Sequence, residues 1–161
     1  MHLKILLAGD GGQGVQTMAD IIGRAAFQNN FHISLIPNYG LEQRGGVSLV
    51  FLQIADQKIA YPKFSQPDML IILSEQARER IGQYQKEGAE IFDFQSFKSF
   101  FEKEKILPAR FNVFFLGVLS KILEDKKICR AGEILDLLEK KLGQKLGWED
   151  NQRIFRAGLN Y

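Results

Sequence analysis

The stretch that decides the fold is residues 3–15, which read LKILLAGDGGQGV. A short apolar run leads directly into glycines, and the residues after them place Val15, Met18 and Ile22 at helical spacing. The apolar run is too short for a signal sequence, so it predicts a first buried strand. Strand, glycine loop and helix in this order predict a single Rossmann-like α/β domain.

Apolar and polar patterning extends this prediction over the first two thirds of the chain. Residues 31–36 indicate a second strand that Pro37 stops, and 47–54 with 58–61 predict two strands around a turn at 56–57. Because that turn is short, we expect these two strands to pair antiparallel within a mixed sheet.

Further elements follow in alternation and then become helical. Strands are expected at residues 69–73 and 89–92, with Ser74 as the N-cap of a helix that runs to about residue 86. After Pro108 the pattern predicts a helical C-terminal third, in which Gly143 ends one helix. The expected architecture is therefore α/β, with one domain spanning residues 1–161.

Composition excludes several classes of function. The chain has 161 residues and a formal net charge of +2, which is too small to predict nucleic-acid binding, and its longest apolar runs are too short for a membrane span. The single cysteine, Cys129, cannot form an internal disulfide and cannot by itself hold an iron–sulfur cluster or a structural zinc ion. A cytoplasmic setting is the default expectation.

The glycine-rich loop at residues 9–14, GDGGQG, is the first candidate site. Missing side chains let backbone N–H groups and the start of a helix face an anion, which favours a phosphate-bearing ligand. A nicotinamide site also needs an acidic residue about 20 positions further on, and the corresponding residues 34–38, SLIPN, contain none. A tight turn with glycines only for packing is the structural alternative.

A different interpretation of the same loop is a magnesium site. The order Gly-Asp-Gly followed by Asn imitates the pattern by which thiamine diphosphate enzymes hold Mg²⁺, with Asp10 and Asn38 as the ligands. The alternative for Asp10 is a plain turn residue that points away from a bound phosphate.

The second candidate site is the stretch 37–48, PNYGLEQRGGVS, which places an aromatic side chain, a carboxylate and a guanidinium before a glycine pair. Arg44 offers a planar fork of donors that suits a phosphate or carboxylate. Its structural alternative is an ion pair with Glu42 that staples a surface loop. The candidate ligand-binding positions of both stretches are Gly9, Gly11, Gly12, Gln13, Gly14, Tyr39, Glu42, Arg44, Gly45 and Gly46.

Together the two motifs, GDGGQGV at 9–15 and YGLEQRGGVS at 39–48, resemble the gamma subunit of the 2-oxoacid:ferredoxin oxidoreductases, which act on pyruvate, 2-oxoglutarate or 2-ketoisovalerate. The order and spacing of both motifs fit that family. The similarity continues through NVFFLG at 112–117 and ends near residues 151–158, although the stretch between Asp93 and Pro108 is hard to match.

The resemblance implies an oxidoreductase subunit that is inactive alone. Thiamine diphosphate, Mg²⁺ and iron–sulfur clusters would lie on partner chains, and this chain would bind no such cofactor firmly, hold no metal and carry no catalytic residue. Its implied partners are alpha and beta subunits, with or without a delta subunit, and ferredoxin is the implied electron acceptor. Its implied contributions are assembly and a surface for coenzyme A, with the glycine loop and Arg44 meeting the phosphates and Tyr39 and Glu42 shaping the loop.

Two alternatives stay open at the level of sequence. The first is a Rossmann-like module that binds a nucleotide or another phosphate ligand without partners, and a homo-oligomer is compatible with the isolated chain. The second concerns a phenylalanine-rich stretch, which is expected to pack in the core but would mark a subunit interface if exposed. Its members are Phe92, Phe94, Phe97, Phe100 and Phe101.

Overall fold

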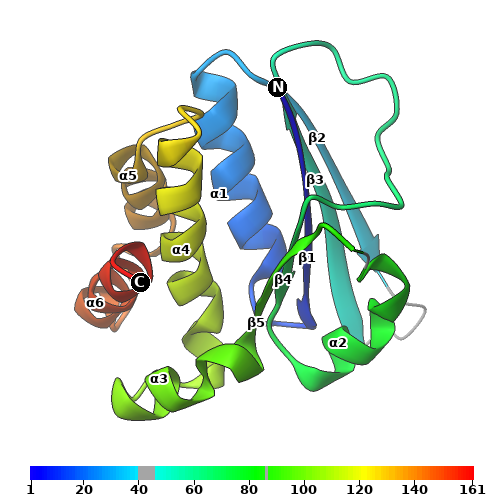
Figure 1. Ribbon diagram of the computed structural model, residues 1–161. Helices are drawn as coiled ribbons and strands as arrows, with labels where there is room; N and C mark the ends of the chain where they lie inside the picture. The colour runs from blue at the N-terminus through cyan, green and yellow to red at the C-terminus, as the bar shows by residue number, and fades with distance from the viewer. Residues whose placement is uncertain (40–45, 86) are drawn as a thin grey trace.

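The computed structural model describes residues 1–39, 46–85 and 87–161. Within them a mixed sheet of five strands has the order β2-β3-β1-β4-β5 (Figure 1). The strands are β1 (His2–Asp10), β2 (His32–Tyr39), β3 (Val47–Ala55), β4 (Met69–Ile72) and β5 (Glu90–Asp93). β1 lies at the centre, antiparallel to β3 and parallel to β4. The predicted α/β class with a mixed sheet is confirmed.

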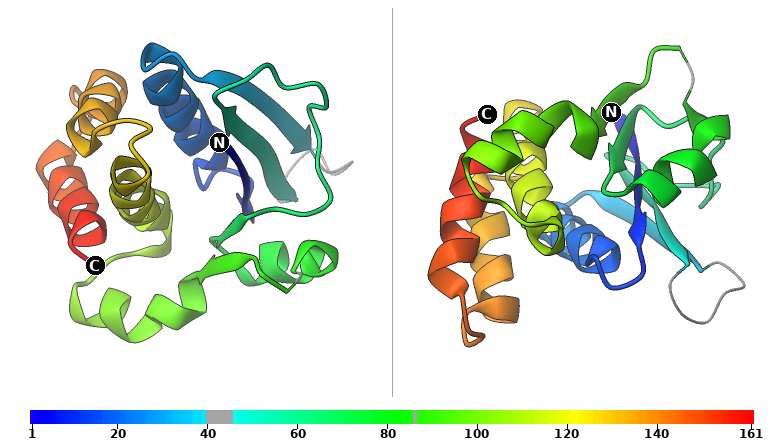
Figure 2. Two further views of the ribbon diagram at one scale, coloured as in Figure 1. Left: turned by 45° about the horizontal axis from the view of Figure 1, so that its top comes forward. Right: turned by 90° about the horizontal axis from the view of Figure 1, so that it is seen from below.

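Helices cover both faces of this sheet, and one face carries more of them than the other. The helices are α1 (Val15–Gln28), α2 (Glu75–Arg80), α3 (Lys98–Lys103), α4 (Phe111–Asp125), α5 (Ala131–Leu142) and α6 (Trp148–Leu159), with short 3₁₀ turns at Gly82–Tyr84, Phe94–Phe97 and Pro108–Arg110. Figure 1 shows α1 against one face with α4, α5 and α6 behind it, and α2 on the opposite face. Figure 2 shows α6 alongside α4 and α5.

The two faces of β1 explain its continuous apolar run. Ile5 and Leu7 belong to the core that contains α1 and α4, whereas Leu6 and Ala8 belong to the smaller core beneath α2. Successive side chains of a strand point to opposite faces, so a strand that is covered on both sides must be apolar at every position. Because β1 is paired with β3 on one side and with β4 on the other, the position of the glycine loop that follows it is fixed relative to the sheet.

The phenylalanine-rich stretch packs inward. Phe97 is 6% exposed and Phe101 is 3% exposed, and both belong to the main core. Phe92, Phe94 and Phe100 are partly buried and pack against that core. The core-packing expectation is therefore confirmed for the cluster as a whole, and the stretch that was hard to match contains α3.

Two glycines let α4 and α6 cross closely. A Cβ atom added at Gly117 would lie 2.1 Å from the carbonyl oxygen of Phe155, and one at Gly158 would lie 2.0 Å from that of Phe114. Both distances are far shorter than a van der Waals contact, so the two backbones touch directly. The C-terminal helices α4 and α6 thus pack backbone against backbone behind α1.

Three details of the predicted elements are wrong. Residues 58–61 form no strand, because both edges of β3 are already paired, with β1 and with β2. Pro37 does not stop the second strand, which continues to Tyr39 because β2 is an edge strand where a missing N–H is tolerated. The helix that Ser74 caps ends at Arg80 and is followed by the 3₁₀ turn instead of reaching residue 86.

No single helix of the described ranges has the length and hydropathy that a membrane span requires. Residues 94–103 and 108–125 meet those criteria only as a pair bent by 109°. Most side chains of α4, the longer member of the pair, are buried inside the fold.

Candidate phosphate-binding site

The fold brings the two sequence motifs together at one edge of the sheet. The N–H of Gly11 donates a hydrogen bond of 2.9 Å to the carbonyl oxygen of Gly46. Gly9 pairs with Ser48 across β1 and β3, and Ser48 pairs in turn with Tyr39 on β2. Motifs that are about 30 residues apart in sequence are therefore neighbours, at the lower end of the sheet in Figure 1 and on the near side in the right panel of Figure 2.

Part of the second motif lies outside the described residues. Glu42, Arg44 and Gly45 fall within residues 40–45, and for Tyr39 only the backbone is described. Their predicted roles in shaping the loop and holding phosphate stay predictions, as does the alternative ion pair between Glu42 and Arg44. Gly46 is described, and it anchors the far end of this stretch to Gly11.

Gln13 braces the glycine loop from inside. Its Oε1 accepts a 2.7 Å hydrogen bond from the N–H of Asp10, and its Nε2 donates to the carbonyl oxygen of Leu73 at 3.4 Å. A Cβ atom at Gly9 would lie 2.8 Å from Gln13 Oε1, so a glycine is needed for this brace to form. The side chain of Gln13 thus ties the end of β1 to the end of β4, and its predicted contact with a ligand stays a prediction.

Asp10 is held at the start of α2. The hydroxyl of Ser74 donates a 2.6 Å hydrogen bond to Asp10 Oδ1, and its oxygen accepts a 3.1 Å bond from the N–H of Ala77. The sequence predicted Ser74 as an N-cap, which is confirmed, but gave no signal for its bond to Asp10, a residue 64 positions earlier. The carboxylate is therefore fixed by a neighbour rather than left as a free turn residue.

This arrangement does not favour the magnesium interpretation. Asn38 lies on β2, and β3 separates β2 from β1, so two strand spacings of about 4.8 Å each separate the backbones of Asp10 and Asn38. In the part of the chain that the structure describes, no group of three or more His, Cys, Asp or Glu side chains is placed to hold a metal ion.

Gly12 and Gly14 present the open part of the loop. Both adopt a left-handed backbone, with φ of 92° and 76°, and Gly14 is the N-cap of α1. Neither N–H has a hydrogen-bond acceptor among the described residues. The first turn of α1 contains no acidic side chain, so these amides and the positive end of the helix dipole are free to attract an anion.

Asn112 forms the wall beside this opening. A Cβ atom at Gly14 would lie 2.4 Å from Asn112 Nδ2, which means that the start of α4 packs directly on the glycine loop. Asn112 Oδ1 is buried without a hydrogen-bond partner among the described residues. The residue opens the NVFFLG stretch, but its contact with the loop was not predicted from the sequence.

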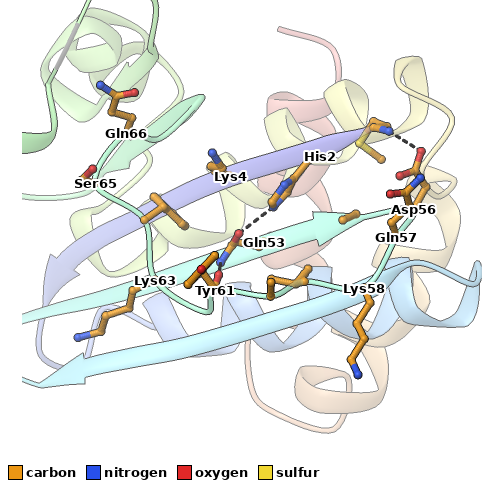
Figure 3. A pocket seen from close by; sticks show the side chains of 15 residues that line it. His2, Lys4, Gln53, Asp56, Gln57, Lys58, Tyr61, Lys63, Ser65 and Gln66 are labelled. Atoms are coloured by element: carbon orange, nitrogen blue, oxygen red, sulfur yellow. Dashed lines mark hydrogen bonds and ion pairs between the residues drawn. The ribbon is translucent and has the colours of Figure 1, made fainter.

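Away from the glycine loop, a polar cavity of about 690 Å³ lies between the sheet and the segment 56–66 (Figure 3). Gln53 crosses it, with Oε1 2.7 Å from His2 Nε2 and with Nε2 donating to the carbonyl oxygen of Tyr61 at 2.7 Å. Figure 3 shows Lys58 and Lys63 pointing away from this bonded core. Because the lysines do not converge, the cavity offers no concentrated anion site.

Comparison with known proteins agrees with the two motifs. A model of the pyruvate ferredoxin/flavodoxin oxidoreductase family matches residues 4–161. The 2-oxoglutarate synthase subunit KorC of Methanocaldococcus jannaschii is 40% identical over 89 residues, which are 55% of this chain and 48% of that one. The pyruvate synthase subunit PorC of Methanothermobacter marburgensis is 35% identical over 75 residues, 45% of this chain and 42% of that one.

Solved structures show the same fold at low identity. A keto/oxoacid ferredoxin oxidoreductase gamma subunit from Geobacter sulfurreducens superposes with a TM-score of 0.72 at 19% identity, over 98% of this chain and 96% of that chain. The 2-oxoglutarate:ferredoxin oxidoreductase from Magnetococcus marinus, solved with 2-oxoglutarate, coenzyme A and succinyl-CoA bound, gives a TM-score of 0.81 at 18% identity over 99% and 30%.

These matches differ in extent. The aligned segments span about half the length, or less, of the curated relatives. The family model, in contrast, covers both motifs, the sheet and all of the C-terminal helices. On that coverage, the chain belongs to the pyruvate ferredoxin/flavodoxin oxidoreductase family.

Proposed function

We propose that this chain is a gamma-type subunit of a multi-subunit 2-oxoacid:ferredoxin oxidoreductase and contributes a binding surface for the phosphates of coenzyme A. The observation that carries the proposal is the junction of the two motifs, in which Gly11 N–H bonds to the carbonyl of Gly46 beside two open amides. In the proposed reaction the 2-oxoacid loses carbon dioxide, the remaining acyl group gives up two electrons, one at a time, to the iron–sulfur acceptor, and the thiol of coenzyme A releases its proton and takes the acyl group as a thioester.

The proposed division of labour follows from what this chain can hold. In the proposed complex, thiamine diphosphate, Mg²⁺ and iron–sulfur clusters belong to alpha, beta or delta partners, and a single cysteine in this chain is consistent with that division. A pyrophosphate would accept hydrogen bonds from the N–H groups of Gly12 and Gly14. Arg44, which follows β2 in the second motif, would supply the balancing positive charge.

Support for coenzyme A comes from two directions. The fold is shared with an enzyme solved with coenzyme A bound, and the curated relatives are named as subunits of 2-oxoacid synthases and oxidoreductases. The chemistry of the loop is consistent with this ligand, because left-handed glycines at a helix start suit phosphate oxygens and the nicotinamide alternative lacks its acidic residue.

Co-purification tests the proposal. The tagged chain is isolated from its native host, and the retained material is assayed for 2-oxoacid-dependent reduction of an artificial electron acceptor, with and without coenzyme A. We expect partner chains that carry thiamine diphosphate and iron–sulfur clusters, and turnover that needs both those partners and coenzyme A. A chain that emerges alone and inert toward every 2-oxoacid would instead favour the independent phosphate-binding module.

A further inference from the structure

The two edges of the sheet differ in how they are protected against pairing with a further strand. β5 forms one edge with only four residues, of which Glu90 and Asp93 are acidic. β2 forms the other edge with eight residues, HISLIPNY, and none of them is acidic, lysine or arginine (Figure 1). Short length and charged side chains keep sheet edges from pairing, so β5 has both protections, whereas β2 has only Pro37.

The hydrogen bonds of the sheet show which backbone groups of β2 face outward. The carbonyl oxygen of Lys4 accepts a 2.9 Å bond from Asp68 N–H, so the backbone groups of the even-numbered residues of β1 point toward β4. Backbone groups along a strand face alternate sides, and the pairings of β1 with β3 and of β3 with β2 carry this alternation to the edge. The backbone groups of Ile33, Leu35 and Pro37 therefore point away from β3, out of the edge.

These outward groups form an open row of donors and acceptors. Pro37 removes no bond of the sheet, because the N–H that it lacks would point outward. The N–H groups of Ile33 and Leu35 have no acceptor among the residues that the structure describes, and the carbonyl oxygens of all three residues have no donor there. Such a row is the template on which another strand adds to a sheet.

An exposed aromatic side chain adjoins this edge on the α1 face of the sheet. A Cβ atom at Gly23 would lie 3.3 Å from Ile33 Cγ2 and 3.9 Å from Leu35 Cδ1, so α1 packs on β2 here. Phe27 follows Gly23 by one turn and therefore lies on the same side of α1, yet it is 70% exposed. An apolar side chain is thus left beside the open row of backbone groups.

The other face of the sheet carries a second exposed ring near this edge. The hydroxyl of Ser34 donates a 3.4 Å hydrogen bond to the carbonyl oxygen of Pro62, which places this part of the chain beside β2. Tyr61, the residue before Pro62, is 81% exposed. Exposed aromatic side chains on both faces of an unprotected edge indicate an interaction surface.

β2 is suited to pair with a second copy of itself. Two copies related by a two-fold axis would run antiparallel at this edge, and each would offer the other the same outward donors and acceptors. Because β2 carries no carboxylate, lysine or arginine, this pairing brings no like charges together, and a charged partner strand would find no counter-charge. The net charge of +2 adds little repulsion between whole chains.

We propose that two copies of this chain dimerise through β2, which joins their five-stranded sheets into one continuous sheet across a two-fold axis. The N–H groups of Ile33 and Leu35 then bond to carbonyl oxygens of the other copy, and Phe27 and Tyr61 lie beside the junction. The inference goes beyond the proposed function and does not depend on it, because these contacts use none of the groups assigned to phosphate binding.

Analytical ultracentrifugation of the full chain at rising concentration measures the dimer, and amide hydrogen exchange by NMR locates it. We expect the amides of Ile33 and Leu35 to exchange about tenfold more slowly, or slower still, at concentrations where the dimer forms. The amides of Ser34 and Ile36 bond to β3 in monomer and dimer alike, so their exchange should change much less.

Two substitutions test the side chains without reaching the core. Phe27→Ser should raise the dissociation constant of the dimer several-fold, whereas Leu146→Ser, at a side chain that is fully exposed elsewhere, should leave it unchanged. His32→Lys should also raise it, because it places a charge at the edge, and Gln144→Lys adds the same charge after α5 as its control. Thermal unfolding confirms that all four variants are folded.

A chain that remains monomeric at every concentration would overturn the inference. So would a dimer in which the amides of Ile33 and Leu35 exchange as fast as in the monomer, because its interface would lie on another face. If the isolated chain is monomeric and these two amides are protected only in the purified multi-subunit complex, the edge belongs to a strand of a different subunit and not to a second copy.

Discussion

Substituting Gly14 by alanine should destabilise the fold for two separable reasons. The first is the left-handed backbone at φ of 76°, which costs a residue with a Cβ about 1–2 kcal/mol. The second is the clash of the new Cβ with Asn112 Nδ2 at 2.4 Å, an overpacking that costs about 1–3 kcal/mol. We therefore expect Gly14→Ala to lower the free energy of unfolding by about 2–5 kcal/mol.

A double substitution separates the two costs. In Gly14→Ala/Asn112→Ala the clash is removed, because the Cβ of residue 112 would lie 3.8 Å from the new methyl group. Asn112→Ala alone should cost little, since the buried Oδ1 that it deletes has no partner among the described residues. The double variant should thus recover about 1–3 kcal/mol relative to the sum of the single changes.

Urea denaturation of the four proteins measures this coupling. Gly88→Ala is the matched control for backbone strain, because Gly88 has φ of 90° with nothing within 4 Å of an added Cβ. It should show only the strain cost of about 1–2 kcal/mol. Costs at Gly14 and Asn112 that simply add, within about 0.5 kcal/mol, would refute the contact between α4 and the glycine loop.

Further results are expected at three other sites. Gly117→Ala should lower the free energy of unfolding by about 2 kcal/mol in urea, because its Cβ meets backbone, whereas Gly132→Ala, with open space around it, should not destabilise. Ser74→Ala should cost about 1–2 kcal/mol by thermal unfolding, because it removes both the cap of α2 and the bond to Asp10, and equal stability would contradict that arrangement. Burial, with Glu133 and Glu124 nearby, raises the pKa of the Cys129 thiol to about 12, so it should resist a thiol reagent at pH 8 until the chain unfolds. Because the unfolded thiol ionises first, this group should make stability fall as the pH rises from 9 toward 12, a dependence that Cys129→Ala should lack.

Periodicity predicted the elements whose burial is simple. β1 and α1 were predicted in the right order and place, because an apolar run followed by helical spacing permits few other structures. The helix that ends at Gly143 was also predicted, and the structure has it as α5.

Pairing between strands could not be predicted from local pattern. Residues 58–61 have the composition of a strand, but β3 had no free edge for them, and this depends on where β1 and β2 lie. A proline such as Pro37 would disrupt a central strand but is tolerated in an edge strand. The sequence pattern does not indicate which strand lies at the edge of the sheet.

The candidate site could likewise be predicted only in part. The sequence indicated both motifs and their ligand chemistry, but not the hydrogen bond between Gly11 and Gly46 that joins them. It did not indicate that Gln13 braces the loop, that Ser74 holds Asp10 or that Asn112 packs on Gly14, since each contact depends on the approach of a distant element.

The most direct test of the account is the KM for coenzyme A in the assembled complex that contains Arg44→Ala. A charge-assisted bond to phosphate is worth about 1.5–3 kcal/mol, so the KM should rise by about tenfold to a hundredfold. The KM for the 2-oxoacid should not change, and Arg24→Ala, which alters an exposed arginine paired with Asp20, should leave both constants unchanged. An Arg44→Ala complex with wild-type KM for coenzyme A would contradict the proposal that this chain binds its phosphates.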